Sequence, residues 1–256
     1  MSNRSVIYVY SDAGASEDMV KHTILSLSKF FYNNQIKTLN AESLIKENWY
    51  QNASLLVMPG GADLPYVEKL NGLGNDIIKN YVHNGGNFLG ICAGAYYASG
   101  YVEFDKSGKY EVLGERELKF FPNKSIGPIL AEYNYFTRSG ARAAEINTNF
   151  TGLETLKIYY NGGGFFNNPK NYPDVEIIAR YQENELAAII RTNYGQGTVI
   201  LSGVHFEVDP FVFDNSDYYL NKIKPQLQES NQHREELLVE LLGNLLSDSN
   251  YEYCDK

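Results

Sequence analysis

One short stretch, Gly90-Ile91-Cys92-Ala93-Gly94 after the apolar pair Phe88-Leu89, restricts the fold of this chain more than any other. Small residues two positions before and two after a central side chain are typical of a strand that turns sharply into a helix, because strand and helix can then approach closely. A helix beginning at Ala93 would point its unpaired N–H groups and positive dipole end at Cys92, making the thiol a better nucleophile. The alternative is a buried cysteine between glycines that serve only close packing.

A histidine late in the chain has the surroundings of a catalytic base. His205 follows the strand-like run 198–202 and the breaker Gly203, and Glu207 stands two positions further on. Residues two apart on an extended chain face the same side, so the Glu207 carboxylate can orient the imidazole and stabilise its protonated form. The alternative is a structural histidine at a strand end. The other histidines lie in helical patterns and are expected at the surface or the edge of the core: His22, His83 and His233.

The first part of the chain alternates strand and helix patterns, which predicts an α/β fold with parallel βαβ units. The expected strands are 5–10, 36–39, 53–58 and 87–91, and the expected helices run from an N-cap at Ser16 to about Tyr32 and through 76–83. Ligands bind at the carboxyl ends of such strands, where Asp12, Gly60 and Asp63 fall together with Cys92. We therefore take Asp12 and Gly60 as candidate substrate-binding residues. For Asp12 and Asp63 the alternative is a turn-forming or capping role.

After residue 101 the pattern becomes rich in short β-segments, which we take as a continuation of the same domain. The expected strands are 109–113, 143–147, 156–160, 175–181 and 186–190, with a hairpin turn at 193–197. Three consecutive glycines at 162–164 lie between the aromatic pairs 159–160 and 165–166. They would let the backbone approach a ligand, so Gly163 and Gly164 are candidate substrate contacts. The alternative is a flexible turn.

The C-terminal segment carries leucine pairs at 237–238, 241–242 and 245–246, an apolar stripe that repeats every four residues. The stripe predicts a helix packed on the domain, with a homodimer surface as the alternative. Pro225 is expected to separate this helix from a shorter one before it, and residues 248–256 are expected to form a frayed tail. We expect one domain over 1–256, with a core at about 5–210 and a helical segment at about 217–247.

Composition restricts the partners. A net charge of −9 argues against nucleic acid or an anionic membrane surface, which leaves a small molecule or an unidentified protein partner. The two cysteines, Cys92 and Cys254, imply no disulfide framework and favour a cytoplasmic location. No run approaches a membrane span of about twenty apolar residues, and no clustered ligand spacing indicates a metal. No cofactor is expected.

The order of these motifs resembles a known superfamily. Pro59-Gly60-Gly61 after an apolar strand, the cysteine turn, and His205-Phe206-Glu207 late in the chain are similar to the class I glutamine amidotransferase-like superfamily. More narrowly, the stretch 90–98 and the motifs 120–122, 160–166 and 202–205 resemble the amidotransferase-like region at the N-terminus of eukaryotic biotin protein ligases and its free-standing bacterial relatives. The resemblance covers roughly residues 5 to 210 and implies a flavodoxin-like fold, with a mostly parallel sheet flanked by helices and added β-rich segments.

The resemblance also implies roles for single residues. Cys92 would be the nucleophile, His205 the base and Glu207 the orienting acid, while backbone N–H groups of Gly61 and Ala93 would form an oxyanion hole. Glutaminases of the superfamily usually carry glutamine or glutamate four positions after the cysteine, where this chain has Tyr96. Glutamine is therefore doubtful as the substrate, although Tyr96 stays a candidate substrate contact. The usual proline between histidine and glutamate is here Phe206, which removes a φ constraint.

Two functions follow from these residues. The first is a cysteine-dependent hydrolase or amidase that attacks the C–N bond of a small amide through a thioester. The alternative is a catalytically silent module of the same fold that binds a small molecule or has a regulatory role. Biotin ligation is not expected, because the chain has no Gly-Arg-Gly-Arg-type adenylate-binding loop.

Overall fold

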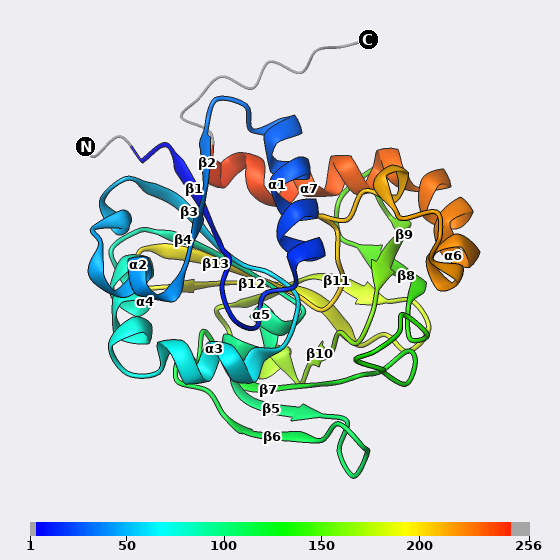
Figure 1. The fold of residues 1–256 in the computed structure, drawn as a ribbon, viewed down its shortest axis with the longest axis horizontal. Helices are drawn as coiled ribbons and strands as arrows, with labels where there is room; N and C mark the ends of the chain where they lie inside the picture. Colours follow the sequence, from blue (N-terminus) through cyan, green and yellow to red (C-terminus); the bar gives the residue numbers. More distant parts are fainter. Residues whose placement is uncertain (1–3, 247–256) are drawn as a thin grey trace.

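The computed structural model describes residues 4–246 and arranges them around one mixed sheet of thirteen strands (Figure 1). The strands are β1 (Val6–Tyr10), β2 (Gln35–Leu39), β3 (Ala53–Met58), β4 (Asn87–Ile91), β5 (Ser99–Phe104), β6 (Val112–Glu115), β7 (Phe121–Gly127), β8 (Arg142–Thr148), β9 (Thr155–Tyr160), β10 (Phe165–Phe166), β11 (Val175–Tyr181), β12 (Ala187–Tyr194) and β13 (Gly197–Ser202). The α-helices are α1 (Glu17–Phe30), α2 (Ala41–Lys46), α3 (Asp63–Leu70), α4 (Leu73–His83), α5 (Ala93–Tyr97), α6 (Tyr218–Glu229) and α7 (Asn231–Leu246). Short 3-10 turns lie at Trp49–Gln51, Pro169–Asn171 and Pro210–Val212.

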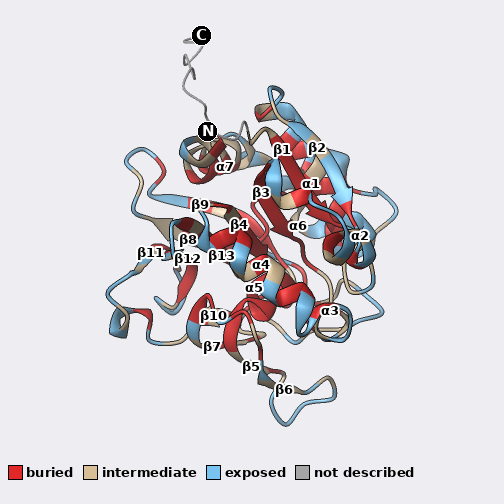
Figure 2. Cartoon of the chain, turned by 90° about the vertical axis from the view of Figure 1, so that its left-hand side faces the viewer, coloured by how far each residue is buried: buried red, intermediate tan, exposed pale blue. Residues whose placement is uncertain are grey.

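One half of the sheet is parallel, in the order β2-β1-β3-β4-β13. Every residue of β1 and β3 is buried, as expected for parallel strands that are covered on both faces. β2 lies at the edge and keeps Gln35, Lys37 and Thr38 exposed, which protects the edge from pairing with another chain. The burial colours show the inner strands of this half at the centre of the molecule (Figure 2).

Helices cover both faces of the parallel half, and alternate residues of one strand serve the two layers. Ile7 of β1 belongs to the same buried cluster as Leu27 of α1 and Leu238 of α7. Tyr10 of β1 faces the other way and meets Tyr66 of α3 edge to face, with ring centroids 5.2 Å apart. The α/β prediction is therefore confirmed. The expected helix at Ser16 is also present, although it ends at Phe30.

The other half of the sheet is mostly antiparallel. From β13 the order continues β12-β10-β7-β5-β6, and β11, β8 and β9 branch from β12. The hairpin predicted at 193–197 joins β12 to β13, and the strands predicted near 143–147, 156–160, 175–181 and 186–190 are present. The sequence patterns did not predict β5 and β7, which pair in parallel.

One predicted strand is wrong in position. Residues 109–111 are not in a strand, and β6 begins only at Val112. The reason is a turn around Asp105: its carboxylate accepts the Tyr110 N–H at 2.7 Å and its carbonyl accepts the Gly108 N–H at 2.7 Å. These bonds hold the backbone away from an extended pairing until residue 112.

The C-terminal helices also differ from the expectation. Pro225 lies inside α6 and does not end it. The helical structure is interrupted at Ser230, between α6 and α7. Ser230 is held by β9, because its hydroxyl accepts the Lys157 N–H at 3.1 Å. The leucine stripe of α7 is buried against the sheet and does not form an exposed surface. The predicted tail at 248–256 lies outside the described residues.

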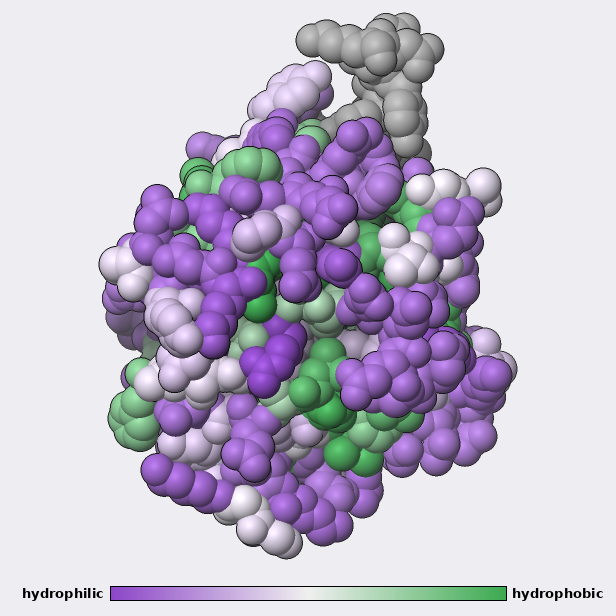
Figure 3. Space-filling view, turned by 90° about the vertical axis from the view of Figure 1, so that its right-hand side faces the viewer, coloured by the Kyte–Doolittle hydropathy of each residue, from purple (hydrophilic) through white to green (hydrophobic). Residues whose placement is uncertain are grey.

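The molecular surface over the branching strands β8 and β9 is largely polar. Hydrophilic side chains cover most of the face that carries α6, β8 and β9 (Figure 3). Among residues 4–246, no helix combines the length and apolar character that crossing a membrane requires.

The packing of α7 gives a test of the fold. Leu241 is 1% exposed within the core, so Leu241→Ala should lower the free energy of unfolding by about 2–5 kcal/mol through lost burial and a residual cavity. Urea unfolding followed by circular dichroism measures the change. The matched control is Asn244→Ala on the exposed side of the same helix, and equal effects of the two substitutions would contradict the described packing.

Candidate active site

The turn from β4 into α5 places Cys92 in a conformation that side chains rarely adopt. Cys92 has φ 51° and ψ −103°, and a non-glycine residue with positive φ costs free energy that surrounding structure must supply. Neighbouring glycines are required here: a Cβ on Gly90 would lie 2.6 Å from the Gly94 carbonyl oxygen, and a Cβ on Gly94 would overlap the Met58 carbonyl oxygen. The Cys92 N–H donates to the Ser202 carbonyl at 2.8 Å, which ties the turn to β13.

His205 and Glu207 lie side by side after β13. His205 Nδ1 is 2.8 Å from Glu207 Oε1, and their side chains are 3% and 2% exposed. The backbone N–H of His205 donates to the Tyr159 carbonyl at 2.8 Å, and the centroids of the Tyr159 and His205 rings lie 5.5 Å apart. Gly60 leaves room for the imidazole, because a Cβ there would lie 2.6 Å from His205 Cε1. Backbone and side-chain contacts therefore fix the orientation of the ring.

The Glu207 carboxylate sets the charge of His205. Burial alone lowers the pKa of the imidazole, but the Glu207 charge, the hydrogen bond to Glu207 and the nearby Cys92 outweigh burial and raise the pKa from 6.5 to about 10. His205 therefore carries a positive charge at neutral pH. The Cys92 Sγ donates a long hydrogen bond to the Asn161 carbonyl at 3.9 Å, and His205 Nδ1 faces Glu207, which leaves Nε2 free of that contact.

A narrow pocket of about 20 Å³ opens beside the Cys92 thiol. Its walls are formed by Gly61, Ala62, Asp63, Cys92, Ala93, Tyr96, Phe104, Tyr133, Tyr135, Asn161 and Gly162. We call it the Cys92 pocket. It is large enough for about one water molecule, so only a small group fits beside the thiol in this conformation.

Two backbone amides of the Cys92 pocket are free to bind an anionic oxygen. Within residues 4–246, neither the Gly61 N–H nor the Ala93 N–H donates a hydrogen bond. The loop that holds Gly61 is fixed on both sides, because Ser16 N–H donates to the Gly60 carbonyl at 2.9 Å and Ala62 N–H donates to the Gly14 carbonyl at 2.8 Å. Such preorganised donors are the elements from which an oxyanion hole is built.

Three residues predicted to contact the substrate, Asp12, Gly163 and Gly164, lie outside the walls of the Cys92 pocket. The Asp12 carboxylate accepts the backbone N–H groups of Ala41 at 2.9 Å and Ala13 at 2.7 Å, and these bonds lower its pKa. Asp12 is thus a turn and helix-capping residue and lies outside the pocket walls. Gly163 and Gly164 also lie outside the pocket walls. Gly163 packs closely on another part of the chain, since a Cβ there would overlap the Gly203 carbonyl. Their small size serves packing of the chain on itself, whereas the neighbouring Gly162 does reach the pocket.

Tyr96 lines the Cys92 pocket, but its hydroxyl has a partner. It is 4% exposed, and its O–H donates to the Gly162 carbonyl at 3.1 Å. The residue therefore presents its ring to the pocket. A polar contact to a substrate at this position would require breaking the bond to Gly162.

Asp63 forms a buried ion pair at the pocket wall. Its Oδ2 accepts hydrogen bonds from Arg116 Nε at 2.8 Å and from one terminal guanidinium nitrogen at 2.6 Å. Asp63 lies in the first turn of α3, and Arg116 follows β6. Sequence patterns did not indicate this pair, because Arg116 stands in an ordinary charged run between two glutamates.

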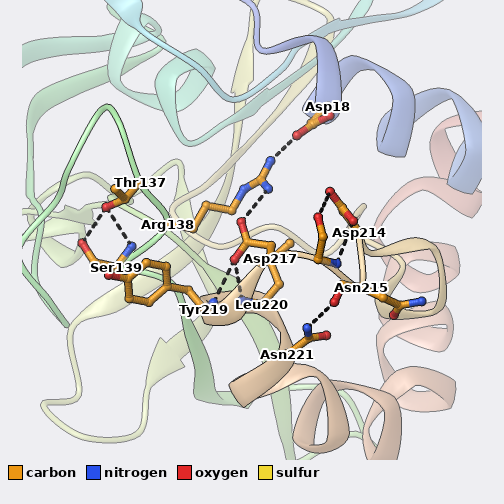
Figure 4. Close-up of polar contacts among 11 residues, drawn as sticks. Asp18, Thr137, Arg138, Ser139, Asp214, Asn215, Asp217, Tyr219, Leu220 and Asn221 are labelled. Atoms are coloured by element: carbon orange, nitrogen blue, oxygen red, sulfur yellow. Dashed lines mark hydrogen bonds and ion pairs between the residues drawn. The ribbon is translucent and has the colours of Figure 1, made fainter.

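Aromatic pocket residues were also missed from sequence. Tyr133 and Tyr135 belong to the segment 128–141, which connects β7 to β8 and has no regular periodicity. Arg138 holds this segment to two helices: its guanidinium pairs with Asp18 of α1 and, at 3.2 Å, with Asp217 before α6 (Figure 4). The segment is therefore a fixed wall of the pocket.

His22 lies close to this site although sequence patterns set it aside. It is 8% exposed, and its Nδ1 accepts the Asp209 N–H at 3.3 Å. Burial lowers its pKa, against the opposing charge of Glu207. Within the described residues, no group of three His, Cys, Asp or Glu side chains is arranged to hold a metal ion.

Comparison with known proteins adds a family and a fold. Residues 5–253 match the family described as "Biotin-protein ligase, N terminal". An uncharacterized protein of Chlamydia muridarum is 35% identical over 253 residues, covering 96% of this chain and 97% of that protein. A biotin–protein ligase of Schizosaccharomyces pombe is 37% identical over 210 residues, covering 78% of this chain and 33% of the ligase, so the chain spans about a third of its length. A ThuA-like protein of Bacteroides uniformis shares the fold, with TM-score 0.55 at 11% identity over 96% of this chain and 93% of that one.

The contact between Gly60 and His205 can be tested by adding one methyl group. Gly60→Ala should displace the imidazole and slow alkylation of Cys92 by iodoacetamide, with a stability cost of about 1–3 kcal/mol from overpacking. Peptide mass spectrometry measures the labelling. Gly243→Ala in α7 is the matched control, because its Cβ would meet no atom closer than 3.9 Å. Unchanged labelling in Gly60→Ala would contradict the described position of His205.

The charge of His205 should appear in the pH dependence of stability. Its pKa rises from 6.5 to about 10 in the folded protein, so the stabilisation that it contributes is complete below about pH 6.5 and is lost as the pH rises towards 10. The free energy of unfolding should therefore fall over this range relative to His205→Gln, by at most about 1.4 kcal/mol per pH unit. Urea unfolding of both proteins at several pH values measures it, and a constant difference would disprove the raised pKa.

Proposed function

The chain belongs to the biotin–protein ligase N-terminal family, and we propose that it is a cysteine-dependent hydrolase that cleaves the C–N bond of a small amide. In this proposal Cys92 is the nucleophile, His205 the general acid and base, and Glu207 the residue that orients His205. The ligase activity of the S. pombe relative belongs to a longer protein, of which the matched region covers 33%, and we do not extend it to this chain.

One observation supports this proposal above all others. Cys92 lies near enough to His205 to help raise its pKa, and Glu207 charges that histidine. The same thiol lines a pocket with two unpaired amides, those of Gly61 and Ala93. A structural cysteine needs none of these groups. A nucleophile that forms a tetrahedral intermediate uses all of them.

The geometry suggests the order of events. The thiol proton of Cys92 passes to His205, the sulfur adds to the amide carbon, and the carbonyl oxygen becomes an oxyanion that accepts hydrogen bonds from the Gly61 and Ala93 N–H groups. His205 Nε2 gives this proton to the leaving nitrogen, the C–N bond breaks, and a thioester remains. Neutral His205 then takes a proton from water, whose oxygen attacks the thioester. The C–S bond breaks, His205 returns the proton to the sulfur, and the carboxylic acid and the thiol are released. Glu207 keeps Nδ1 protonated and the ring oriented throughout.

The order of effects in variants tests this proposal. On a panel of small amides, Cys92→Ala should abolish turnover, whereas Glu207→Gln should leave the fold intact and reduce turnover by a smaller factor, because losing the orienting group only misplaces the base. Ammonia or amine release measures the rates, and circular dichroism checks the fold. Free glutamine should give near-background release, because the Tyr96 ring takes the place of a polar contact.

Other results would redirect the proposal. Turnover that persists in Cys92→Ala would exclude the thioester route. Binding of an amide by the wild-type protein without any turnover, and with Cys92 resistant to iodoacetamide, would instead favour the catalytically silent binding module.

A further inference from the structure

We propose that Arg234 and Ser26 are positioning residues for the proposed reaction, because they hold the backbone on both sides of Glu207 and so keep its carboxylate against the His205 imidazole. The inference rests on the proposed function and adds one side chain from α7 and one from α1 to its machinery. Neither residue lines the Cys92 pocket, so both act through Glu207.

The Glu207 carboxylate has few contacts of its own. Its Oε1 lies 2.8 Å from His205 Nδ1. Its Oε2 is buried and, among the residues that the structure describes, has no hydrogen-bond partner, so no second hydrogen bond fixes the direction of the side chain. The residue before it, Phe206, has no proline ring to restrict its φ. The place of the carboxylate therefore depends on what holds the backbone of this turn.

Two buried side chains hold that backbone. Arg234 donates from one terminal guanidinium nitrogen to the Phe206 carbonyl at 2.9 Å, and the Ser26 hydroxyl donates to the Glu207 carbonyl at 2.7 Å. Arg234 is 3% exposed and Ser26 is 4% exposed, so water does not compete for these carbonyls. The two bonds fix the planar peptide groups before and after the Glu207 Cα. They thereby set φ and ψ of Glu207 and the direction in which its side chain leaves the backbone.

A third contact continues along the same stretch of backbone. His22 lies one turn before Ser26 on α1, so that the two side chains share a face of the helix. Its Nδ1 accepts the Asp209 N–H at 3.3 Å. Successive turns of α1 thus contact the chain on the C-terminal side of Glu207, while α7 contacts it on the N-terminal side.

The surroundings of Arg234 do not indicate a role in the stability of α7. It lies near the start of that helix, where the positive end of the helix dipole disfavours a cation. Burial lowers the pKa of Arg234, against the opposing charges of Glu235, Asp209 and Glu207. An apolar side chain at such a buried position is often at least as stabilising as a charged one. The bond to the Phe206 carbonyl is the contact that an apolar residue cannot replace.

The guanidinium of Arg234 is itself fixed in place. Its Nε donates to the Asn231 side-chain oxygen at 2.9 Å, and its other terminal nitrogen donates to Glu235 at 3.1 Å. The same Glu235 oxygen accepts a hydrogen bond from Lys29 of α1 at 2.7 Å. The two helices that hold the turn are thus tied to each other, which is the kind of supporting contact that a precisely placed site requires.

Ser26→Ala tests the inference, because it removes one of the two bonds without changing a charge. The pKa of His205 should fall from about 10 towards 6.5, since the carboxylate is held less closely against Nδ1. Labelling of Cys92 by iodoacetamide at pH 7 should slow by about two- to tenfold, the equivalent of one hydrogen bond, because less imidazolium is present to favour the thiolate. The ring ¹⁵N chemical shifts of His205 against pH, assigned by their absence in His205→Gln, measure the first effect, and peptide mass spectrometry measures the second.

Thr23→Val is the matched control on the same helix. Thr23 is 1% exposed, and its hydroxyl donates to the Met19 carbonyl at 2.7 Å within α1. This variant also loses a buried hydroxyl, but it should leave the His205 pKa and the labelling of Cys92 as in the wild-type protein. Circular dichroism and urea unfolding check the fold and the stability of each variant.

Arg234→Met removes the second bond together with a positive charge. Loss of a nearby cation alone would raise the His205 pKa, whereas loss of the hold on the backbone lowers it, so the sign of the change separates the two effects. A lowered pKa is expected, and a raised one would overturn the positioning role of Arg234. If Arg234→Met does not fold, Ser26→Ala decides the inference.

The outcomes separate this inference from the proposed function. If Cys92 of the wild-type protein is labelled no faster than Cys92 of His205→Gln, the proposed function fails and the positioning roles fail with it. If it is labelled faster, but Ser26→Ala and Arg234→Met lower only the stability and leave the His205 pKa unchanged, the two residues are structural. The inference is then wrong while the nucleophile stands.

Discussion

The structure depends on one backbone constraint, the left-handed turn at Cys92 between β4 and α5. That turn requires glycine at 90 and 94, because a Cβ at either position would meet backbone atoms. It also fixes the thiol at the carboxyl end of β4, beside the start of α5. The strand order β3-β4-β13 then brings the Gly60-Gly61 loop and His205 to the same end of the sheet. The site is therefore a consequence of parallel strands that end side by side.

The two halves of the sheet contribute different parts of the site. The parallel half supplies the groups to which the proposed reaction assigns chemical roles: Cys92 after β4, the Gly61 amide after β3 and His205 after β13. The antiparallel half supplies the walls, with Phe104 from β5 and the tyrosines of segment 128–141 after β7. A catalytic frame built by one half can thus be combined with a binding surface that varies in the other.

Sequence patterns predicted the part of the site that local rules determine. The cysteine turn, the His-x-Glu spacing and the apolar parallel strands each have a short-range signal. The walls have none, because Tyr133 becomes a pocket residue only when Arg138 ties its segment to α1 and α6, contacts far apart in sequence. Asp12, Gly163 and Gly164 lie outside the pocket walls for the related reason that their backbone neighbours, such as Ala41 and Gly203, are set only by the three-dimensional fold. Pro225 lies inside α6, and the helix ends before Ser230, whose hydroxyl accepts the Lys157 N–H from β9.

The most direct test of the account is the position of one oxygen atom. In a crystal structure of the protein with acetaldehyde bound to Cys92 as a hemithioacetal, the account predicts that the aldehyde-derived oxygen lies about 2.7–3.1 Å from both the Gly61 and the Ala93 nitrogen atoms, with His205 still bonded to Glu207. An oxygen that points into solvent, with both amides unbound to it, would contradict the claim that this turn was shaped for nucleophilic catalysis.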